Sequence, residues 1–196
     1  MSDTTRVNPQ NERTRAMTEI AIFVAFAFVL EVISKIFPSM PQGGSVSVSM
    51  VPIIVLAYRR GLLAGIGAGL AFGLLNAILA GFYAVHWASI FLDYFIPAGV
   101  WGLSALFFLW LGRNKTTPFV VSVIVVGLLQ FMSHYASGVL FYGEFAPEGT
   151  PVWLYSLTYN AWYMVPSIVL SAIIIVWIWK RLKPMLTEEL LNRNLF

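Results

Sequence analysis

The apolar run SIFLDYFIPAGVWGLSALFFLWLG, from Ser89 to Gly112, decides the fold class of this chain, and Asp93 is its one charged residue. The run is long enough for a helix that crosses a bilayer, which takes roughly 20 apolar residues. A carboxylate in such a segment is costly to bury, and ionisable groups within membrane spans usually mark ligand or ion pathways. The stretch therefore predicts a transmembrane helix with a functional acid near one end.

The composition of the whole chain also favours an integral membrane protein. Of its 196 residues, 59% are hydrophobic and only 11% are charged, whereas about a quarter of residues are charged in typical soluble domains. A soluble protein of this size could not bury so much apolar surface. The absence of cysteine excludes disulfides and cysteine metal sites. The net charge of +3 does not argue for nucleic acid, and no nucleic-acid partner is expected.

The apolar segments predict an all-α bundle of six transmembrane helices. The expected spans are residues 16–37, 47–58, 62–82, 87–111, 118–141 and 154–179. The second is short, contains Pro52 and follows SVSVS, which alternates like a strand; neighbouring helices could shelter such a segment. The expected organisation is a cytosolic tail (1–15), a membrane domain (16–184) and a second cytosolic tail (185–196).

Basic residues alternate between the predicted connections. They precede the first span, separate the second from the third and the fourth from the fifth, and follow the sixth: Arg6, Arg13, Arg15, Arg59, Arg60, Arg113, Lys115, Lys180, Arg181 and Lys183. The other connections lack Lys and Arg, apart from Lys35 at the end of the first span, whose long stem can reach the interface. Because cytoplasmic loops are enriched in basic residues, both termini are predicted to be cytosolic. The opposite connections are rich in Pro, Gly and aromatic residues, which suggests an outward-facing site.

Spans four, five and six each bring one polar side chain to a similar depth near the outer face: Asp93, His134 and Asn160. His134, Gly138 and Tyr142 recur at i, i+4 and i+8 and share one helix face, where Gly138 leaves room for a flat ligand. Aromatic residues stand beside each polar group, as in small-molecule pockets; they are Tyr94, Tyr135, Tyr142, Tyr159 and Trp162. A carboxylate among aromatic faces would suit an organic cation, since each cation–π contact is worth roughly 0.5–2 kcal/mol.

Other interpretations of these residues are open. Asp93 could be hydrated or hydrogen-bonded to a neighbouring helix, and His134 and Asn160 could be packing residues beside an interfacial aromatic belt. Gly138 is equally suited to close helix packing. Asp93 and His134 could also form the proton relay of an ion-coupled secondary transporter. An enzyme is disfavoured, because the chain has no G-x-S-x-G, H-E-x-x-H or P-loop motif.

The first predicted span holds a pair of small residues, Ala21 and Ala25, four positions apart. A small-xxx-small pair lets another helix approach closely. The pair could form a docking surface for a membrane partner, although alanine is common in any spanning helix.

Several longer motifs resemble those of the thiamine-specific S-components of energy-coupling factor (ECF) transporters. They are SMPQGGSVSVSMVPI (39–53), LAYRRG (56–61), FLDYF (91–95), SHYASG (133–138) and FAPEGTPVWLYSLTYNAWYMVPS (145–167). The resemblance covers nearly the whole chain from Thr18 to Lys180. It implies a six-helix subunit of the bacterial cytoplasmic membrane that captures thiamine (vitamin B1) at the outer face. It implies no catalytic site, cofactor or metal. The implied partners are a transmembrane T-component and two ATP-hydrolysing A-components.

The resemblance also implies roles for individual residues. Substrate binding is expected, by match to the family motifs, of Asp93, Tyr94, His134, Gly138, Tyr142, Tyr155, Asn160, Tyr83 and Phe72. Docking to the partner subunits is expected of Ala21 and Ala25. The first outer connection, with Pro41, Gly43 and Gly44, is expected to act as a lid.

The chain departs from the family pattern at several of these positions. Some members carry Glu at the position of Asp93, and some carry Trp at those of Tyr142 and Phe72. Others have a Trp in the first outer loop, which this chain lacks. An S-component for another vitamin is an alternative, although the acidic and aromatic set does not suit an anionic vitamin such as biotin.

Overall fold

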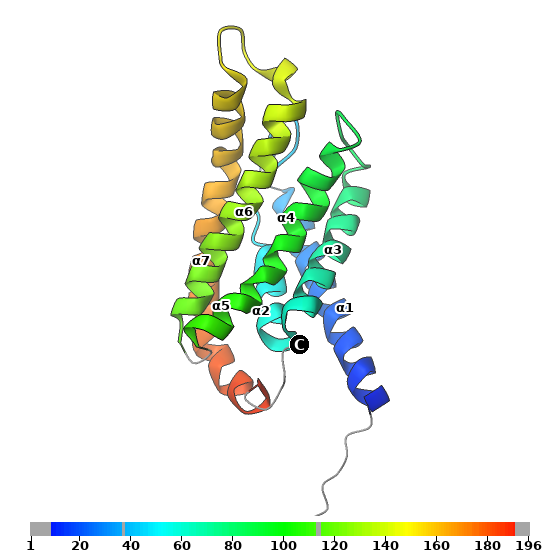
Figure 1. The fold of residues 1–196 in the computed structure, drawn as a ribbon, viewed down its shortest axis with the longest axis vertical. Helices are drawn as coiled ribbons and strands as arrows, with labels where there is room; N and C mark the ends of the chain where they lie inside the picture. Colours follow the sequence, from blue (N-terminus) through cyan, green and yellow to red (C-terminus); the bar gives the residue numbers. More distant parts are fainter. Residues whose placement is uncertain (1–8, 37, 113–114, 191–196) are drawn as a thin grey trace, which may run out of the picture.

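The computed structural model describes residues 9–36, 38–112 and 115–190, and all the regular structure in these ranges is helical (Figure 1). The elements are α1 (Pro9–Ser34), α2 (Met50–Arg60), α3 (Leu62–Leu79), η1 (Phe91–Phe95), α4 (Ile96–Gly99), η2 (Val100–Leu103), α5 (Ser104–Leu111), α6 (Thr117–Phe141), η3 (Gly143–Phe145) and α7 (Val152–Leu190). Parts of both predicted tails, residues 1–8 and 191–196, lie outside the described residues.

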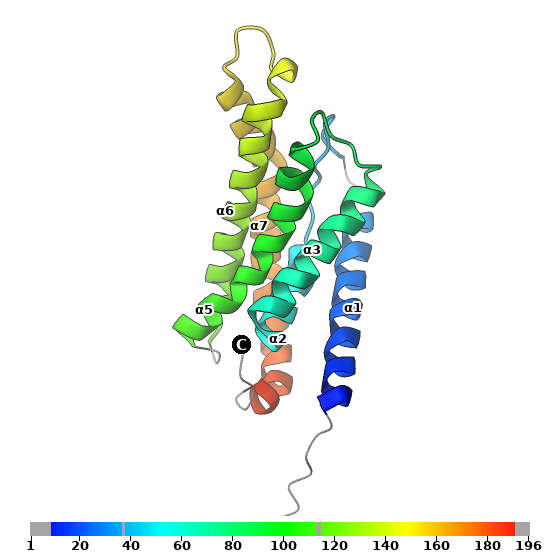
Figure 2. The same ribbon diagram turned by 45° about the vertical axis from the view of Figure 1, so that its right-hand side comes forward.

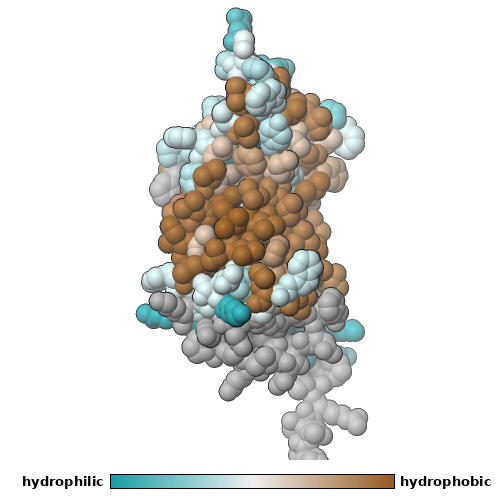
Figure 3. Space-filling model, turned by 60° about the vertical axis from the view of Figure 1, so that its left-hand side comes forward, coloured by the Kyte–Doolittle hydropathy of each residue, from teal (hydrophilic) through white to brown (hydrophobic). Residues whose placement is uncertain are grey.

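Five helical segments of the described chain are long and apolar enough to cross a membrane. They are Gln10–Ser34, Leu62–Leu79, Phe91–Leu111, Thr117–Phe141 and Val152–Trp179. Figure 3 shows a broad apolar band across the middle of one face, with more polar residues toward the ends. These segments correspond to five of the six predicted spans, and they confirm an all-helical membrane protein.

The predicted second span, residues 47–58, differs from the structure. Helix α2 has 11 residues and is about 16 Å long, roughly half the thickness of the hydrocarbon core. Residues 45–48 before it are neither helix nor strand, because serine side chains compete for backbone hydrogen bonds and disfavour helix. The described residues thus contain five helical segments long enough to span a membrane and, at the place of the predicted second span, the short helix α2.

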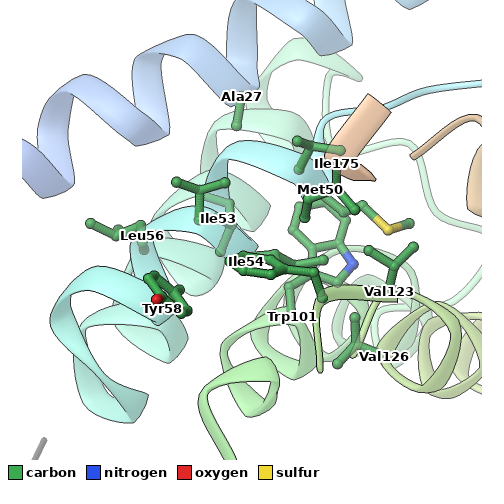
Figure 4. Packing of buried hydrophobic residues seen from close by; sticks show 14 of the residues in the cluster. Ala27, Met50, Ile53, Ile54, Leu56, Tyr58, Trp101, Val123, Val126 and Ile175 are labelled. Carbon is green, nitrogen blue, oxygen red and sulfur yellow. The ribbon is translucent and has the colours of Figure 1, made fainter. Parts of the chain in front are cut away.

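Helix α2 forms the centre of the hydrophobic core. Every residue from Met50 to Tyr58 is buried, as expected of a helix that is apolar on nearly all sides. Figure 4 shows Ile53, Ile54 and their neighbours packed among side chains of α1, η2, α6 and α7, including Ala27, Trp101, Val123 and Ile175. Met50, Phe72 and Trp101 belong both to this core and to the wall of a cavity above it. The core therefore supports the floor of that cavity.

The arrangement of the helices places both described ends of the chain together. Helix α1 begins and α7 ends at the same end of the bundle, near the α2–α3 and α5–α6 connections (Figures 1 and 2). The α1–α2, α3–η1 and α6–α7 connections reach toward the opposite end. Five spanning helices alone would leave the two ends of the chain at opposite ends of the bundle. Residues 38–60, which comprise the extended segment and α2, must therefore return the chain from one end toward the other.

Glycines bring α3 close to the irregular fourth span. Gly65, Gly69 and Gly73 recur every four residues along α3, and a Cβ at Gly69 would lie 2.1 Å from the carbonyl oxygen of Ala98. At Gly73 a Cβ would lie 2.5 Å from the carbonyl oxygen of Tyr94. Small residues permit such close helix contacts in membranes. The packing holds η1, and with it Asp93, against α3.

We expect Gly69→Ala to destabilise the protein and Gly67→Ala to leave it unchanged or slightly more stable. Alanine is favoured over glycine by about 1 kcal/mol within a helix, and a Cβ at Gly67 meets no atom within 4 Å. At Gly69 the backbone of Ala98 blocks the added methyl group, and such overpacking costs about 1–3 kcal/mol. Thermal unfolding of the two purified variants in detergent measures the difference. Equal unfolding temperatures would contradict the close contact.

Candidate functional site

Asp93 lies in a π-helical turn that Pro97 helps to produce. Pro97 has no N–H, and its ring would clash with the carbonyl group four residues earlier, that of Asp93, in a regular α-helix. The chain widens instead, and the N–H of Ile96 donates to the carbonyl oxygen of Phe91, five residues back. Ser133 of α6 donates to the carbonyl oxygen of Leu92 at 2.7 Å. The neighbouring helix thus satisfies backbone that the irregular turn exposes, as an interior of low polarity requires.

The carboxylate of Asp93 faces α6. Its Oδ2 atom accepts hydrogen bonds from Ser137 at 2.9 Å and from the Tyr142 hydroxyl at 3.3 Å. The Nδ1 atom of His134 lies 3.5 Å from Oδ1. Burial, and to a lesser degree the charge of Asp93, raise the pKa of Tyr142 to about 12, so this phenol stays neutral and can donate at physiological pH. No Lys or Arg of the described chain forms an ion pair with Asp93; His134 does so only when it is protonated.

Asn160 is fixed within α7. Its amide nitrogen donates to the carbonyl oxygen of Ser156 at 2.9 Å, and its Oδ1 atom accepts a hydrogen bond from the Tyr163 hydroxyl at 2.7 Å. The rings of Tyr163 and His134 meet edge to face with centroids 6.2 Å apart. Tyr163 therefore links two predicted site residues, His134 of α6 and Asn160 of α7, through a ring contact and a hydrogen bond.

The first outer connection is attached to α7 by two tyrosines. The Tyr159 hydroxyl accepts from the backbone N–H of Gln42 at 2.8 Å and donates to the carbonyl oxygen of Gly43 at 2.9 Å. The Tyr155 hydroxyl donates to the Gln42 side chain at 3.1 Å. Gly44 has φ +95°, and a Cβ there would lie 2.6 Å from the ring of Tyr163. The connection can approach α7 this closely because Gly44 has no side chain.

These groups surround one cavity of about 180 Å³. All nine substrate-binding residues expected from sequence line it: Phe72, Tyr83, Asp93, Tyr94, His134, Gly138, Tyr142, Tyr155 and Asn160. Gln42, Gly43 and Gly44 of the first outer connection line it as well. Segments that are distant in sequence, among them α3, η1, α6, α7 and the first outer connection, thus supply aromatic faces and hydrogen-bonding groups to a single space. This is the character of a small-molecule site.

Two aromatic residues grouped with the site in the sequence analysis lie elsewhere. Neither Tyr135 nor Trp162 lines the cavity; Tyr135 stacks on Phe131, and Trp162 is 69% exposed. Each lies close in sequence to a cavity residue on the same helix but on a different face of that helix. Closeness in sequence alone does not show which face a side chain occupies.

Gly138 has a packing role in addition to its place in the cavity wall. A Cβ at Gly138 would lie 2.2 Å from the Ser156 hydroxyl of α7. The room that the sequence analysis assigned to a flat ligand is therefore largely taken up, on that side, by the α6–α7 contact.

Several polar cavity residues were missed, among them Glu31, Asn76 and Gln130. Glu31 is 6% exposed, pairs with Lys35 at 2.9 Å and accepts hydrogen bonds from Ser47 and Ser49. The signal for these three was present in the sequence, because each is a polar residue within a predicted span. Lys35, expected to reach the interface, pairs with Glu31 beside the cavity, and its side chain is 41% exposed.

Ala21 and Ala25 lie apart from this cavity, on α1. Both are exposed, and neither lines the cavity. Exposed apolar residues flank them, including Ile22, Phe26 and Val29. This face of α1 is open to lipid or to another membrane helix.

A helical membrane bundle that encloses a polar and aromatic cavity near one end belongs to the class of membrane proteins that bind or transport small molecules. Comparison with known proteins is more specific. The chain belongs to the thiamine transporter protein family (Thia_YuaJ), whose model matches residues 17–187. This confirms the resemblance read from the sequence motifs.

Named relatives and solved structures agree with this assignment. The chain is 41% identical to the thiamine transporter ThiT of Bacillus subtilis over 85% of its length and 91% of that protein. It is 31% identical to ThiT of Lacticaseibacillus paracasei over 85% and 87%. ThiT from Listeria monocytogenes matches with a TM-score of 0.76 at 29% identity, over 89% of this chain and 98% of that one. The relatives are named as transporters, which confirms the expectation that the chain is not an enzyme.

A more distant structure shows the same fold. It is described as the S component of a bacterial ECF transporter and matches with a TM-score of 0.64 at 18% identity, covering 90% of this chain and 99% of that one.

Proposed function

We propose that this chain is the substrate-binding membrane subunit, or S-component, of an ECF-type transporter, and that it captures thiamine at the outer face of the cell membrane for ATP-driven import. The main support is the convergence of the nine expected binding residues on one cavity. The names of the relatives supply the cargo.

The chemistry of the cavity suits thiamine. Thiamine carries a permanently cationic thiazolium ring and a hydrogen-bonding aminopyrimidine ring. Asp93 provides a negative charge whose partners in the chain are hydroxyl groups and one imidazole. Aromatic residues such as Phe72, Tyr94 and Tyr142 supply faces for flat, cationic rings. In this proposal the ligand brings the positive charge that Asp93 faces.

The distribution of basic residues supports an orientation for the bundle. Arg59 and Arg60 close α2, and Lys115 precedes α6; both connections lie at the end of the bundle where α1 begins (Figure 1). Cytoplasmic loops are enriched in Lys and Arg, so we assign this end and both termini to the cytosol. The extended segment and α2 then provide the second of six crossings, and the cavity lies toward the outside.

The lipid-facing side of α1 is the surface we assign to docking. Ala21 and Ala25 expose small side chains on this face, and small residues allow another helix to approach closely. The partners would be a transmembrane T-component and two ATP-hydrolysing A-components.

Reconstitution tests the coupling to ATP. We expect liposomes that contain the chain together with T- and A-components to accumulate thiamine in an ATP-dependent manner, and liposomes with the chain alone to accumulate none. The Asp93–His134 contact of 3.5 Å favours one competing function, proton-coupled transport by the chain itself. Uptake by the chain alone, driven by a pH gradient, would establish that function in place of the proposal.

Gly44→Ala is expected to weaken thiamine binding more than Gly43→Ala, by about ten-fold. Both glycines have φ +95° and carry the same backbone cost on substitution, but only at Gly44 would a Cβ meet Tyr163; nothing lies within 4 Å at Gly43. The clash displaces the connection from α7 and opens the cavity, and an overpacking cost of about 1–3 kcal/mol corresponds to roughly 5–200-fold in affinity. Calorimetric titration compares the variants, and equal affinities would argue against closure by this connection.

A further inference from the structure

Asn76 is the one polar side chain that α3 contributes to the cavity. Phe72, Asn76 and Ala80 recur every four residues and all line the cavity, so they share the face of α3 that is turned toward it. Every other residue of α3 is apolar or glycine. A lone amide in a helix of this composition is not needed to pack α3, since glycines make the contacts with the fourth span.

The amide oxygen of Asn76 is buried and has no hydrogen-bond partner among the described residues. The polar groups across the cavity differ in this respect. Asp93 accepts from Ser137 and Tyr142, and Asn160 is hydrogen-bonded through both its nitrogen and its oxygen. A buried acceptor without a partner is destabilising, and most buried polar side chains of native proteins are paired. An exception inside a ligand cavity points to the ligand as the partner.

We propose that Asn76 is a further substrate-binding residue and that its amide oxygen accepts a hydrogen bond from an N–H or O–H group of the bound cation. The inference rests on the proposed function, because thiamine offers two such donors, the amino group of its pyrimidine and the hydroxyl of its hydroxyethyl chain. A neutral acceptor adds little to charge recognition. It adds specificity, since a buried group built to pair with a ligand donor discriminates against analogues that lack that donor.

The test combines one nearly isosteric variant with two ligand analogues. Purified full chain, as wild type and as Asn76→Leu, is titrated calorimetrically with three ligands. They are thiamine, an analogue in which hydrogen replaces the pyrimidine amino group, and an analogue in which ethyl replaces hydroxyethyl. We expect Asn76→Leu to lower the affinity for thiamine about ten-fold. One analogue lacks the donor group that Asn76 accepts from, and the wild type and Asn76→Leu should bind that analogue with equal affinity. For the other analogue, the wild type should still bind about ten-fold more tightly than Asn76→Leu.

A second readout separates this role from a structural one. Ligand-free Asn76→Leu should unfold at the same or a higher temperature than the wild type, because the change removes an unpaired buried polar group. If the leucine variant does not fold, Asn76→Ala removes the same acceptor and should show the same loss of about ten-fold for thiamine and the same pattern with the two analogues.

Two results would overturn the inference while leaving thiamine binding intact. One is an unchanged thiamine affinity of Asn76→Leu. The other is a ten-fold loss that persists with both analogues, which would indicate a general distortion of the cavity. Absence of thiamine binding by the wild-type chain is a different result, since it removes the proposed function and this inference with it.

Discussion

Replacing Asp93 with Asn is expected to lower the affinity for thiamine by about 100-fold. Hydrogen bonds and contacts that involve a charged group contribute about 1.5–3 kcal/mol, and the upper value corresponds to roughly two orders of magnitude in affinity. Asn has nearly the shape of Asp, and the hydroxyls of Ser137 and Tyr142 can rotate to accept from its amide. The loss therefore reports the missing charge rather than a collapsed site. Calorimetric titration of the purified variant measures it.

Glu148→Gln is the matched control for that experiment. Glu148 is exposed on the α6–α7 connection and does not line the cavity, so removal of its charge should leave the affinity unchanged. If the two variants lose affinity equally, the negative charge acts through the general electrostatic field of the outer face, and the role assigned to Asp93 is wrong.

Ala25→Leu is expected to abolish ATP-dependent thiamine uptake by the assembled transporter while leaving thiamine binding unchanged. Ala25 is exposed on α1, away from the cavity, so a larger side chain there does not disturb the core. It would, however, prevent a partner helix from approaching the small-residue face closely. Uptake into liposomes and binding to the isolated chain are measured for the same variant.

Ala71→Leu provides the comparison for this prediction. Ala71 is exposed on α3, and the substitution adds the same bulk to a different helix. Normal uptake by Ala25→Leu would exclude docking at that position. Equal loss in both variants would assign the effect to a bulky exposed side chain in general rather than to a specific surface.

Composition and hydropathy were sufficient to predict most of the fold. Five of the predicted spans are present as long apolar helices, because the bilayer requires that each spanning segment satisfy its own backbone hydrogen bonds. The second span differs because residues 45–48 are irregular and at least partly buried. There, the Ser47 hydroxyl donates to the carboxylate of Glu31, and the Ser47 backbone N–H donates to the hydroxyl of Ser167. These partners are distant in sequence and no local pattern contains them.

The candidate site was predicted unevenly, for physical reasons that differ between residues. Asp93, His134 and Asn160 were identified as polar groups at one depth of a membrane. Tyr83 and Phe72 depended on the family resemblance, since an aromatic residue in a span or a connection has no unusual cost. Glu31, Asn76 and Gln130 obey the same rule as Asp93 but were overlooked. The contact of Gly138 with Ser156 required the packing of α6 on α7, which sequence spacing does not determine.

The central claim is that this cavity binds a cationic vitamin, and direct titration of the purified full chain with thiamine tests it. We expect saturable binding of one thiamine per chain, detected by calorimetry and by a change in intrinsic tryptophan and tyrosine fluorescence, with no response to biotin at the same concentrations. A chain that remains folded in detergent and shows no response to thiamine in either measurement would contradict the proposed function.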